Sequence, residues 1–257
     1  MTPFSIIFEN DELLLINKPA GVSVQGGANI FHPLDEELSA QLGYKIHLVH
    51  RLDRETSGIL VVAKDSASAA KWTKLFSQRE VKKEYVAFCT GIPSPDGKKT
   101  KMEGTLRGTV EAHGRTQTAE LHYKVESVAE IDLPSDGKTE DRTPGTDKIT
   151  LSKIRIRLGT GRMHQIRIQM AKALSPLASD DKHGDFKANK RLRKIGIKKL
   201  CLAAVRLTLP LDGTEHTFEI PLPDHMEKIE REYKDFFVEA KSFGATTKQM
   251  NLDNWSN

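Results

Sequence analysis

The chain has 257 residues, of which 38% are hydrophobic and 29% charged, a composition typical of a folded protein and not of a disordered one. No apolar run approaches the ~20 residues of a membrane-spanning helix, and the first residues lack a basic segment ahead of an apolar one, so neither a membrane protein nor a signal peptide is predicted. The two cysteines, Cys89 and Cys201, lie far apart, which excludes a disulfide framework and fits a reducing, cytoplasmic location.

The net charge of +4 is distributed unevenly along the chain. Between Lys148 and Lys199 the sequence holds fifteen Lys or Arg residues and only three acidic residues. Charge asymmetry of this size is typical of a protein with one face that binds a polyanion such as nucleic acid. A solvated basic surface that only aids solubility explains the charge equally well, so charge alone does not decide between the two.

The first part of the chain alternates short apolar strands with turns and two helices. Residues 9–12 form a polar turn between two apolar stretches, which predicts a β-hairpin. A helix over residues 33–42 ends at a glycine, and Asp65 or Ser66 caps a second helix that runs to about Arg79. The strands predicted here are Phe4–Phe8, Leu13–Asn17, Tyr44–His50, Ile59–Ala63 and Val81–Cys89.

The second part of the chain continues with strands and two more helices. Ile154, Ile156 and Leu158 alternate with basic residues, which predicts a strand with one apolar face. An Asp212-Gly213 turn joins two further strands as a hairpin. The elements predicted here are the strands Ser152–Leu158, Leu200–Leu209 and Thr217–Ile220, and the helices Arg162–Leu174 and Pro223–Glu239.

Many strands, several of them linked as hairpins, interleave with few helices. This pattern predicts an α+β fold in which helices pack on a mixed, largely antiparallel sheet. We expect residues 1–240 to form one catalytic domain and residues 241–257 to form a polar C-terminal tail. Residues 132–147 are polar and rich in Pro and Gly, and we expect them to be a mobile excursion between two strands.

The loop from His50 to Gly58 is the most unusual segment, because five charged or titratable residues stand between two apolar strands. Loops held by rigid strands often carry catalytic residues, although most loop aspartates are only solvated. One hypothesis is a glycosidase that uses Asp53 and Glu55 as paired carboxylates. The basic segment and the aromatic content of only 6% do not favour a sugar-cleaving enzyme.

Four blocks in this sequence resemble the motifs of RluA-type pseudouridine synthases, in the same order along the chain. The blocks are Asn17-Lys18-Pro19-Ala20-Gly21, His50-Arg51-Leu52-Asp53 with Thr56-Ser57-Gly58, Lys83-Glu84-Tyr85-Val86-Ala87, and Gly161-Arg162-Met163-His164-Gln165-Ile166-Arg167. The resemblance spans residues 6 to 230. It implies the pseudouridine synthase catalytic fold and the isomerisation of uridine in RNA to pseudouridine.

The reaction that the resemblance implies is redox-neutral and breaks no bond with water. The bond from the ribose to N1 of the base breaks, the base turns, and a bond to C5 forms. This chemistry agrees with a sequence that has no dinucleotide or phosphate-loop fingerprint and no paired metal-ligand spacing among its nine histidines. We therefore expect no cofactor and no metal.

The resemblance also implies the catalytic residues. Asp53 matches the family's essential aspartate, which either attacks covalently or takes a proton from the ribose. Arg167 is the predicted cation that keeps this carboxylate charged. Tyr85 matches the tyrosine that stacks on the target base and helps to relay a proton at C5. Arg51 matches the residue that fills the gap left by the flipped uridine.

A second group of residues is predicted to bind RNA. Free N–H groups at the start of the helix expected at Arg162 predict a phosphate site. His164 either joins that site or is a buried structural histidine, and the sequence does not choose between the two roles. Lys187–Lys199 holds seven basic residues and no acid, which favours contact with an RNA backbone over a merely solvated helix. The predicted RNA-binding residues are Arg51, Arg54, Arg162, His164, Lys190, Arg191, Arg193 and Lys194.

The basic segment is similar to that of the branch that modifies large-subunit ribosomal RNA, so ribosomal RNA is the favoured partner and transfer RNA the alternative. Three positions depart from the family: Gln169 and Ala203 stand where His is usual, and Ser179 stands where Gly is usual. The small RNA-binding domain that often precedes the catalytic domain is expected to be missing. A non-catalytic RNA-binding protein is the remaining rival, and the chain is expected to be a cytoplasmic monomer.

Overall fold

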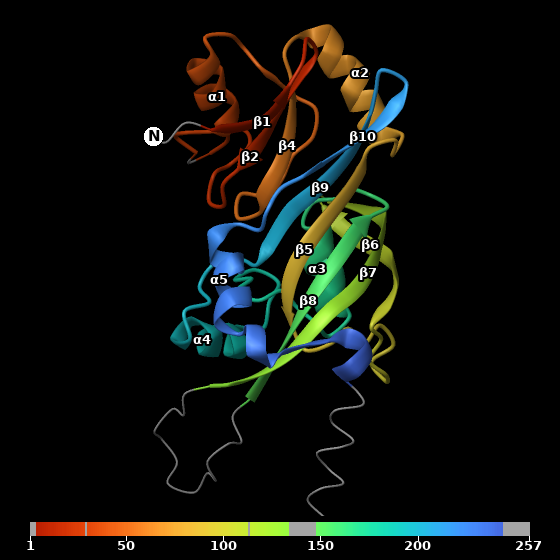
Figure 1. Ribbon diagram of the computed structural model, residues 1–257. Helices are drawn as coiled ribbons and strands as arrows, with labels where there is room; N and C mark the ends of the chain where they lie inside the picture. The colour runs from red at the N-terminus through yellow and green to blue at the C-terminus, as the bar shows by residue number, and fades with distance from the viewer. Residues whose placement is uncertain (1–3, 29, 113, 134–147, 244–257) are drawn as a thin grey trace, which may run out of the picture. The chain divides into compact units, whose positions relative to one another are not determined.

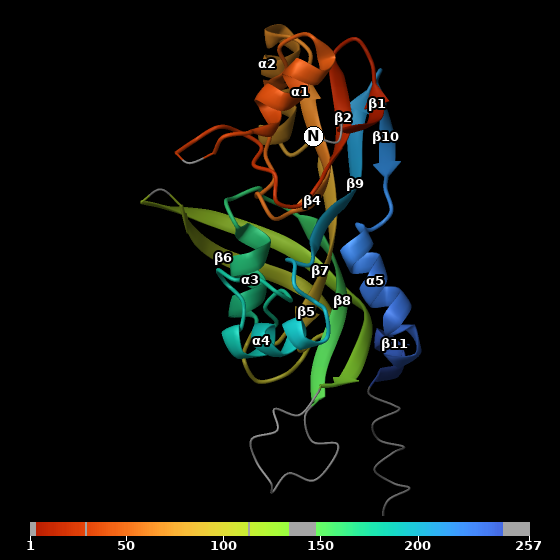
Figure 2. The ribbon, with the colours of Figure 1, turned by 90° about the vertical axis from the view of Figure 1, so that its left-hand side faces the viewer.

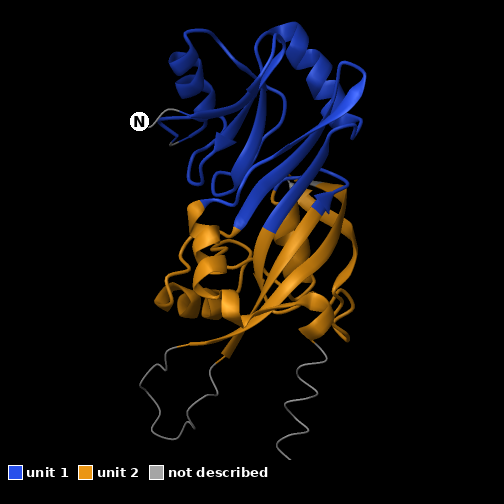
Figure 3. Ribbon diagram, viewed as in Figure 1, with its two compact units in different colours: residues 1–86, 157–163, 202–223 blue, residues 87–156, 164–201, 224–257 orange. Residues whose placement is uncertain are grey.

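Residues 4–28, 30–112, 114–133 and 148–243 are described by the structure, a computed structural model (Figure 1). Their helices and strands group into two units (Figure 3). Unit 1 takes residues 1–86, 157–163 and 202–223, and unit 2 takes the rest of the chain. The catalytic domain expected over residues 1–240 stays a prediction. Residues 134–147 and 244–257, most of the expected excursion and tail, lie outside the described residues.

The N-terminal hairpin of unit 1 forms where the apolar strands predict it. Strands β1 (Ser5–Glu9) and β2 (Leu13–Lys18) pair antiparallel. The side chain of Asn10 closes the turn, because its Oδ1 accepts hydrogen bonds from the N–H groups of Glu12 and Leu13 at 3.0 and 2.9 Å. The hairpin therefore presents β2, which is almost fully buried, to the rest of the sheet.

The sheet of unit 1 is mixed, as predicted. Strand β4 (Ser57–Ala63) is buried along its whole length and pairs antiparallel with β2. On its other side β4 pairs parallel with β9 (Leu202–Leu211), and β10 (Thr214–Glu219) returns antiparallel to β9. Because a strand buried on both faces needs apolar residues at every position, the Ile59–Ala63 run has no polar alternation.

Two helices complete unit 1. Helix α1 (Leu34–Leu42) ends at Gly43, whose φ of 77° is left-handed. Helix α2 (Ser66–Ser77) begins at Asp65, whose side chain accepts a hydrogen bond from the Ser68 N–H. Helix α2 buries Trp72 completely in the apolar core. Both caps are of the kind that the sequence predicts.

Unit 2 contains long antiparallel strands with helices around them. Strand β6 (Glu103–Ala112) pairs with β7 (Arg115–Asp132). Strand β8 (Lys148–Leu158) contributes most of its length to this unit, and β5 (Lys82–Thr90) enters it from residue 87 onward. The predicted alternation in β8 is confirmed, because Ile154 and Ile156 are buried between more exposed basic neighbours. Helices α3 (Gln165–Lys172) and α4 (Phe186–Lys194) lie on one side of β5 and β8, and α5 (Asp224–Glu232) lies on the other (Figure 2).

Three predicted elements differ from the structure. The strand expected over residues 44–50 is reduced to the two residues of β3 (His47–Leu48). The helix expected from Arg162 begins only at Gln165, because His164 has a left-handed φ of 52° that a right-handed helix cannot include. The last predicted helix ends at Glu232. It is followed by a 3-10 turn (Lys234–Phe236) and β11 (Phe237–Glu239), whose partner β7 lies about a hundred residues earlier in the chain.

Candidate active site

The Asp53 loop, residues 51–56, is held in place through its main chain. The Thr56 N–H donates to the Asp53 carbonyl at 3.1 Å, and the Gly21 N–H donates to the Arg54 carbonyl at 2.8 Å. Arg54 returns a bond from its Nε to the Gly21 carbonyl at 3.0 Å. The loop is therefore fixed to the Lys18-Pro19-Ala20-Gly21 segment, while Asp53 stays partly exposed.

Lys18 is a buried cation beneath this loop. It has no exposed surface, and its ammonium donates to the carbonyls of Pro19, Val22 and Arg54 at 2.9, 2.8 and 3.0 Å. Burial lowers the pKa of Lys18 to about 8, although the nearby carboxylates of Glu55 and Asp53 oppose that shift. Sequence reasoning assigned Lys18 only to a motif. Its position predicts its burial, because Lys18 follows Ile16 by two residues and so lies on the same, buried side of an apolar strand.

Gly58 ends the loop at a point where no side chain fits. Its φ is +115°, and a Cβ atom there would lie 2.2 Å from the carbonyl oxygen of Ala204 in β9. The β4 strand pairs with β9 at this residue. Glycine is therefore required for the loop to enter the buried strand at this place.

His50, which opens the motif, has a structural role. Its Nε2 accepts a hydrogen bond from the Val61 N–H at 2.9 Å, and its ring stacks on Phe76 with 4.4 Å between centroids. Burial, with a smaller effect from the Lys83 charge, lowers the pKa of His50 to about 3. The ring is therefore neutral at physiological pH and suited to accept this bond.

Tyr85 lies close enough to Asp53 to be affected by its charge. The residue is 6% exposed on β5, and burial raises the pKa of its phenol, with the Asp53 carboxylate adding to the shift. The phenol is therefore protonated at neutral pH and remains a hydrogen-bond donor. The structure thus places Tyr85 near Asp53, as the motifs predict.

Lys83 is a further cation on the same face of β5, two residues before Tyr85. Its Nζ lies 5.4 Å from the centre of the Phe76 ring, and burial lowers its pKa. A Cβ on Gly161 would lie 3.2 Å from that Nζ, so Lys83 approaches the Gly159-Thr160-Gly161 turn closely. Sequence reasoning used Lys83 only as part of a motif and missed this placement.

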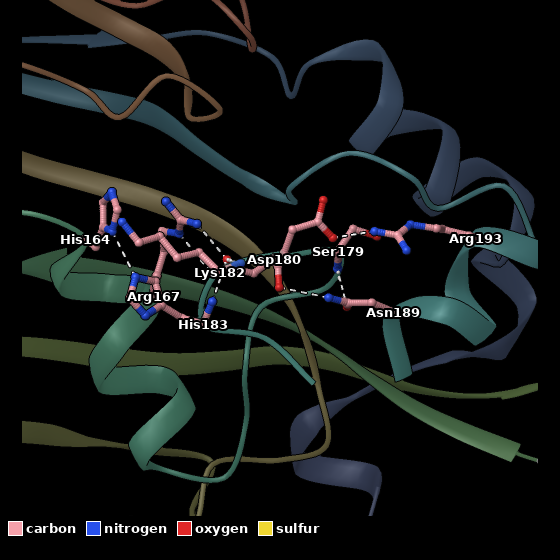
Figure 4. A network of polar contacts seen from close by, with 9 residues as sticks. His164, Arg167, Ser179, Asp180, Lys182, His183, Asn189 and Arg193 are labelled. Atoms are coloured by element: carbon pink, nitrogen blue, oxygen red, sulfur yellow. Dashed lines mark hydrogen bonds and ion pairs between the residues drawn. The ribbon is translucent and has the colours of Figure 1, made fainter. Parts of the chain in front are cut away.

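Arg167 belongs to a buried polar network of unit 2 (Figure 4). It is 7% exposed, and its Nε and Nη2 donate to the two carboxylate oxygens of Asp180 at 2.8 and 2.6 Å. Burial works against ionisation of Asp180, but the bonds from Arg167 and from the His183 and Lys182 N–H groups outweigh it and lower the Asp180 pKa. The action of Arg167 on Asp53 stays a prediction.

The residues expected to bind phosphate near Arg162 are arranged differently from the prediction. Arg162 is exposed but precedes helix α3, so the helix N-terminus does not lie at Arg162. His164 stands at that N-terminus, and its Nδ1 lies 2.8 Å from the Nε2 of His183. His164 is therefore half-buried and bonded within the protein, while Arg51 is exposed in the Asp53 loop.

Helix α4, the basic helix, presents most of its predicted RNA-binding residues to solvent. Lys190, Arg193 and Lys194 are exposed. Arg193 forms an ion pair with Asp181, and the half-buried Arg191 donates from Nη2 to the Lys148 carbonyl at 3.4 Å. Part of the positive charge is thus matched within the protein, which charge counting along the sequence does not show.

The three departures from the family motifs all lie at structural positions. Gln169 is buried, and its Nε2 donates to the carbonyls of Leu106 in β6 and Ala119 in β7 at 2.9 and 3.3 Å. Ser179 has a φ of 56°, a region in which glycine is usual. Ala203 pairs with Ser57 where β9 meets β4. These contacts indicate that the three positions support the fold.

Among the described residues, no three or more His, Cys, Asp or Glu side chains are grouped so that they could hold a metal ion. In the same part of the chain, no helix is long and apolar enough to cross a membrane.

The family model described as RNA pseudouridylate synthase matches residues 12–172, which include the Asp53 loop, Tyr85 and Arg167. This chain belongs to that family. It is 31% identical over 238 residues to ribosomal large subunit pseudouridine synthase C of Haemophilus ducreyi, a match that covers 87% of this chain and 67% of the relative. It is 28% identical over 255 residues to pseudouridine synthase D of Escherichia coli, with 91% and 72% covered.

Solved structures of the same family share the fold. Human RNA pseudouridylate synthase domain containing 4 aligns with a TM-score of 0.66 and 23% identity, over 91% of this chain and 94% of the human chain. Human RNA pseudouridylate synthase domain containing 1 aligns with a TM-score of 0.63 and 21% identity, over 86% and 84%. The motif resemblance, the α+β class and the assignment as a pseudouridylate synthase are therefore confirmed.

Proposed function

We propose that this enzyme isomerises specific uridines of structured RNA, and that its substrate is large-subunit ribosomal RNA. The observation that carries the proposal is the rigid Asp53 loop, with the protonated phenol of Tyr85 close to Asp53. The relatives named as ribosomal large subunit pseudouridine synthases C and D support the choice of RNA. Transfer RNA is the alternative substrate that the experiment below separates.

Asp53 starts the reaction in this proposal. Its carboxylate either attacks the ribose or takes a proton from it, and the bond from C1′ to N1 of the base breaks in either case. The base then turns and C5 bonds to C1′, while the bond to Asp53 breaks or the ribose proton returns. N1 takes up a proton, and C5 loses its own. Tyr85, which is uncharged and buried beside the loop, stacks on the flat base and helps to relay that proton. The guanidinium of Arg167 keeps the Asp53 carboxylate ionised.

Arg51, exposed in the same loop, fills the gap that the flipped uridine leaves in the RNA. A planar guanidinium stacks like a base and also bonds phosphate, so one residue serves both purposes. Arg54, Arg162 and His164 contact the neighbouring backbone in this proposal. Arg54 uses its Nε on the Gly21 carbonyl, which leaves its terminal nitrogens to reach RNA.

The basic helix α4 binds the RNA backbone in this proposal. Its exposed side chains include Lys187, Lys190 and Lys194, and its first residue, Phe186, is 76% exposed. Phosphate contacts supply most sequence-independent affinity, and an exposed aromatic among cations is suited to stack on an unpaired base. This combination favours a folded RNA with a looped-out base over a uniform duplex.

We further propose that the protein works as a cytoplasmic monomer without a metal or cofactor. Both cysteines are buried free thiols, and burial raises the pKa of Cys201 to about 12, so it resists oxidation. Light scattering tests the oligomeric state. Full activity after exhaustive chelation and dialysis is expected, and a rate that a metal restores would contradict the proposal.

The test is pseudouridine mapping of total RNA from cells with and without this gene, together with the purified protein on the RNA so identified. We expect one or a few sites in large-subunit ribosomal RNA to lose pseudouridine without the gene and to regain it with the purified protein. Sites confined to transfer RNA would correct the substrate. Binding of ribosomal RNA with no site modified would favour a non-catalytic RNA-binding protein.

A further inference from the structure

The guanidinium of Arg167 is held in one orientation by a two-point contact. Its Nε and Nη2 each donate to a different oxygen of the Asp180 carboxylate, at 2.8 and 2.6 Å. A single contact would leave the long side chain free to rotate, whereas a bidentate pair fixes both the position and the plane of the guanidinium. Arg167 therefore depends on where Asp180 is placed.

Asp180 is itself fixed by its own turn. Its side chain has no exposed surface, and its Oδ1 also accepts from the N–H groups of Lys182 and His183 at 3.0 Å each. The Gly184 N–H donates to the Asp180 carbonyl at 3.0 Å, and a Cβ on Gly184 would lie 2.3 Å from that carbonyl oxygen. The turn over residues 179–184, the Asp180 turn, thus has one tight conformation.

Asn189 joins the Asp180 turn to the basic helix α4. Its Nδ2 donates to the Asp180 carbonyl at 2.8 Å, and its Oδ1 accepts from the Ser179 N–H at 2.9 Å. The residue is 2% exposed, so water does not compete for these bonds. Both ends of one amide are used on consecutive residues of the turn, which ties the helix to the turn at two points (Figure 4).

The Asp180 turn also reaches the residues before helix α3. The N–H of His183 is one of the donors to Asp180, while its ring nitrogen Nε2 lies 2.8 Å from Nδ1 of His164. Arg193 of α4 pairs with Asp181 in the same turn. A single turn therefore links Arg167, His164 and the basic helix.

We propose that Asp180 and Asn189 are positioning residues, which fix the Arg167 guanidinium for the reaction and anchor it to the helix that binds the RNA backbone. The inference rests on the proposed function, in which Arg167 acts with Asp53. A buried ion pair contributes little to stability compared with apolar residues of the same size. Its value here is geometric, because a displacement of about 1 Å in a reacting group costs up to about 100-fold in rate.

The experiment compares Asn189→Ala with the parent protein on the RNA fragment found by mapping, under single-turnover conditions with saturating protein. We expect the rate constant to fall about 10- to 100-fold, while the Kd for the RNA changes less than about threefold. The matched control is Ser152→Ala, which also removes one buried bond in unit 2, from its Oγ to the Gly91 carbonyl at 2.6 Å. This control is expected to keep the parent rate within about twofold.

A double-mutant cycle with Arg167→Lys decides whether Asn189 acts through Arg167. If it does, Asn189→Ala lowers the rate less than about twofold once Arg167 is already replaced. If the two substitutions lower the rate additively, or if Asn189→Ala changes only the Kd, the inference is wrong. The proposed function would still stand, because the parent protein is active. A parent without activity would overturn the proposed function and this inference with it.

Thermal melting accompanies each measurement, because Asn189 is buried. If Asn189→Ala shows no native transition, Asn189→Asp replaces it in the cycle. That variant keeps the size of the residue and an acceptor for the Ser179 N–H but places an oxygen against the Asp180 carbonyl. It is expected to lower the rate by the same 10- to 100-fold or so with the Kd retained. A parent-like rate in this variant would also overturn the inference.

Discussion

The Asp53 loop of unit 1 and the Asp180 turn of unit 2 both centre on an aspartate, but they use it differently. In the Asp180 turn the carboxylate itself is the hub, because Arg167 and two backbone N–H groups bond to it. In the Asp53 loop the contacts that fix the chain go to the carbonyl oxygens of Asp53 and Arg54. Asp180 is fully buried, whereas Asp53 is partly exposed.

The two aspartates show how two roles of a carboxylate are separated in one enzyme. Main-chain bonds and the buried ammonium of Lys18 hold the loop that carries the reacting carboxylate. A carboxylate that only positions a neighbour is stabilised as an anion by several donors. Replacing Asp53 should therefore affect the reaction with little change in stability, whereas replacing Asp180 should lower stability as well as the rate.

The largest effect is expected for Asp53→Asn. This variant should abolish isomerisation while the RNA Kd stays within about tenfold of the parent, because the carboxylate acts on the bond and the basic surface supplies most of the affinity. Quantitative pseudouridine detection and a binding titration measure the two properties. Turnover by the pure variant would contradict the catalytic role assigned to Asp53.

Asp180→Asn should reduce stability in addition to the rate. Removing the charge leaves Arg167, which is 7% exposed, without its bidentate carboxylate, and loss of one partner of a buried pair costs about 3–5 kcal/mol. Urea unfolding of parent, Asp53→Asn and Asp180→Asn measures this cost. Equal unfolding free energies for the two variants would remove the contrast between the loop and the turn.

Gly58→Ala tests whether the backbone holds the Asp53 loop. A Cβ at this position would meet the Ala204 carbonyl at 2.2 Å, and the residue has a φ of +115°, so the free energy of unfolding should fall by at least about 3 kcal/mol. Gly213→Ala is the control, because its φ of 78° is also left-handed but a Cβ would meet nothing within 4 Å. Similar losses in both variants would show that φ alone matters.

Because His50 is neutral in the folded protein, we expect the stability of the protein to decrease at acid pH. Its pKa is about 3 in the folded protein and near 6.5 in an unfolded chain, so between these values the unfolded state binds more protons and stability falls as the pH decreases. Because the residue is partly exposed, we expect a loss of at most about 2 kcal/mol between pH 6.5 and 4.5. The His50→Gln variant should lack this component in urea unfolding at both pH values.

The smallest effect is expected at the basic helix. Lys190→Glu with Lys194→Glu should weaken RNA binding and reduce the slope of log K against log salt by about 0.7–0.9 for each phosphate that is no longer bound. Arg191 and Arg193 should contribute less, because they also bond to Lys148 and Asp181. The control is Lys74→Glu on α2, an exposed site in unit 1. A salt slope that does not change would show that α4 is only a solvated surface.

Features that depend on near neighbours in the chain could be predicted from the sequence alone. The Asp65 cap, the Gly43 stop and the alternation of β8 each involve residues a few positions apart, so local patterns predict them. The motifs around Asp53 and Tyr85 likewise identify the family from the sequence. The predicted end of the last helix was too late, because β11 exists only through its pairing with β7.

The tertiary structure determines which charged side chains are buried and bonded within the protein. Lys18 is buried because residue 54, 36 positions later, supplies a carbonyl to its ammonium. Arg167 meets Asp180 because the chain returns after 13 residues in a turn that Asn189 completes. The left-handed His164 that delays helix α3 lies beside His183, also distant in sequence. Burial and partners of this kind arise from long-range packing, and no pattern of neighbouring residues encodes them.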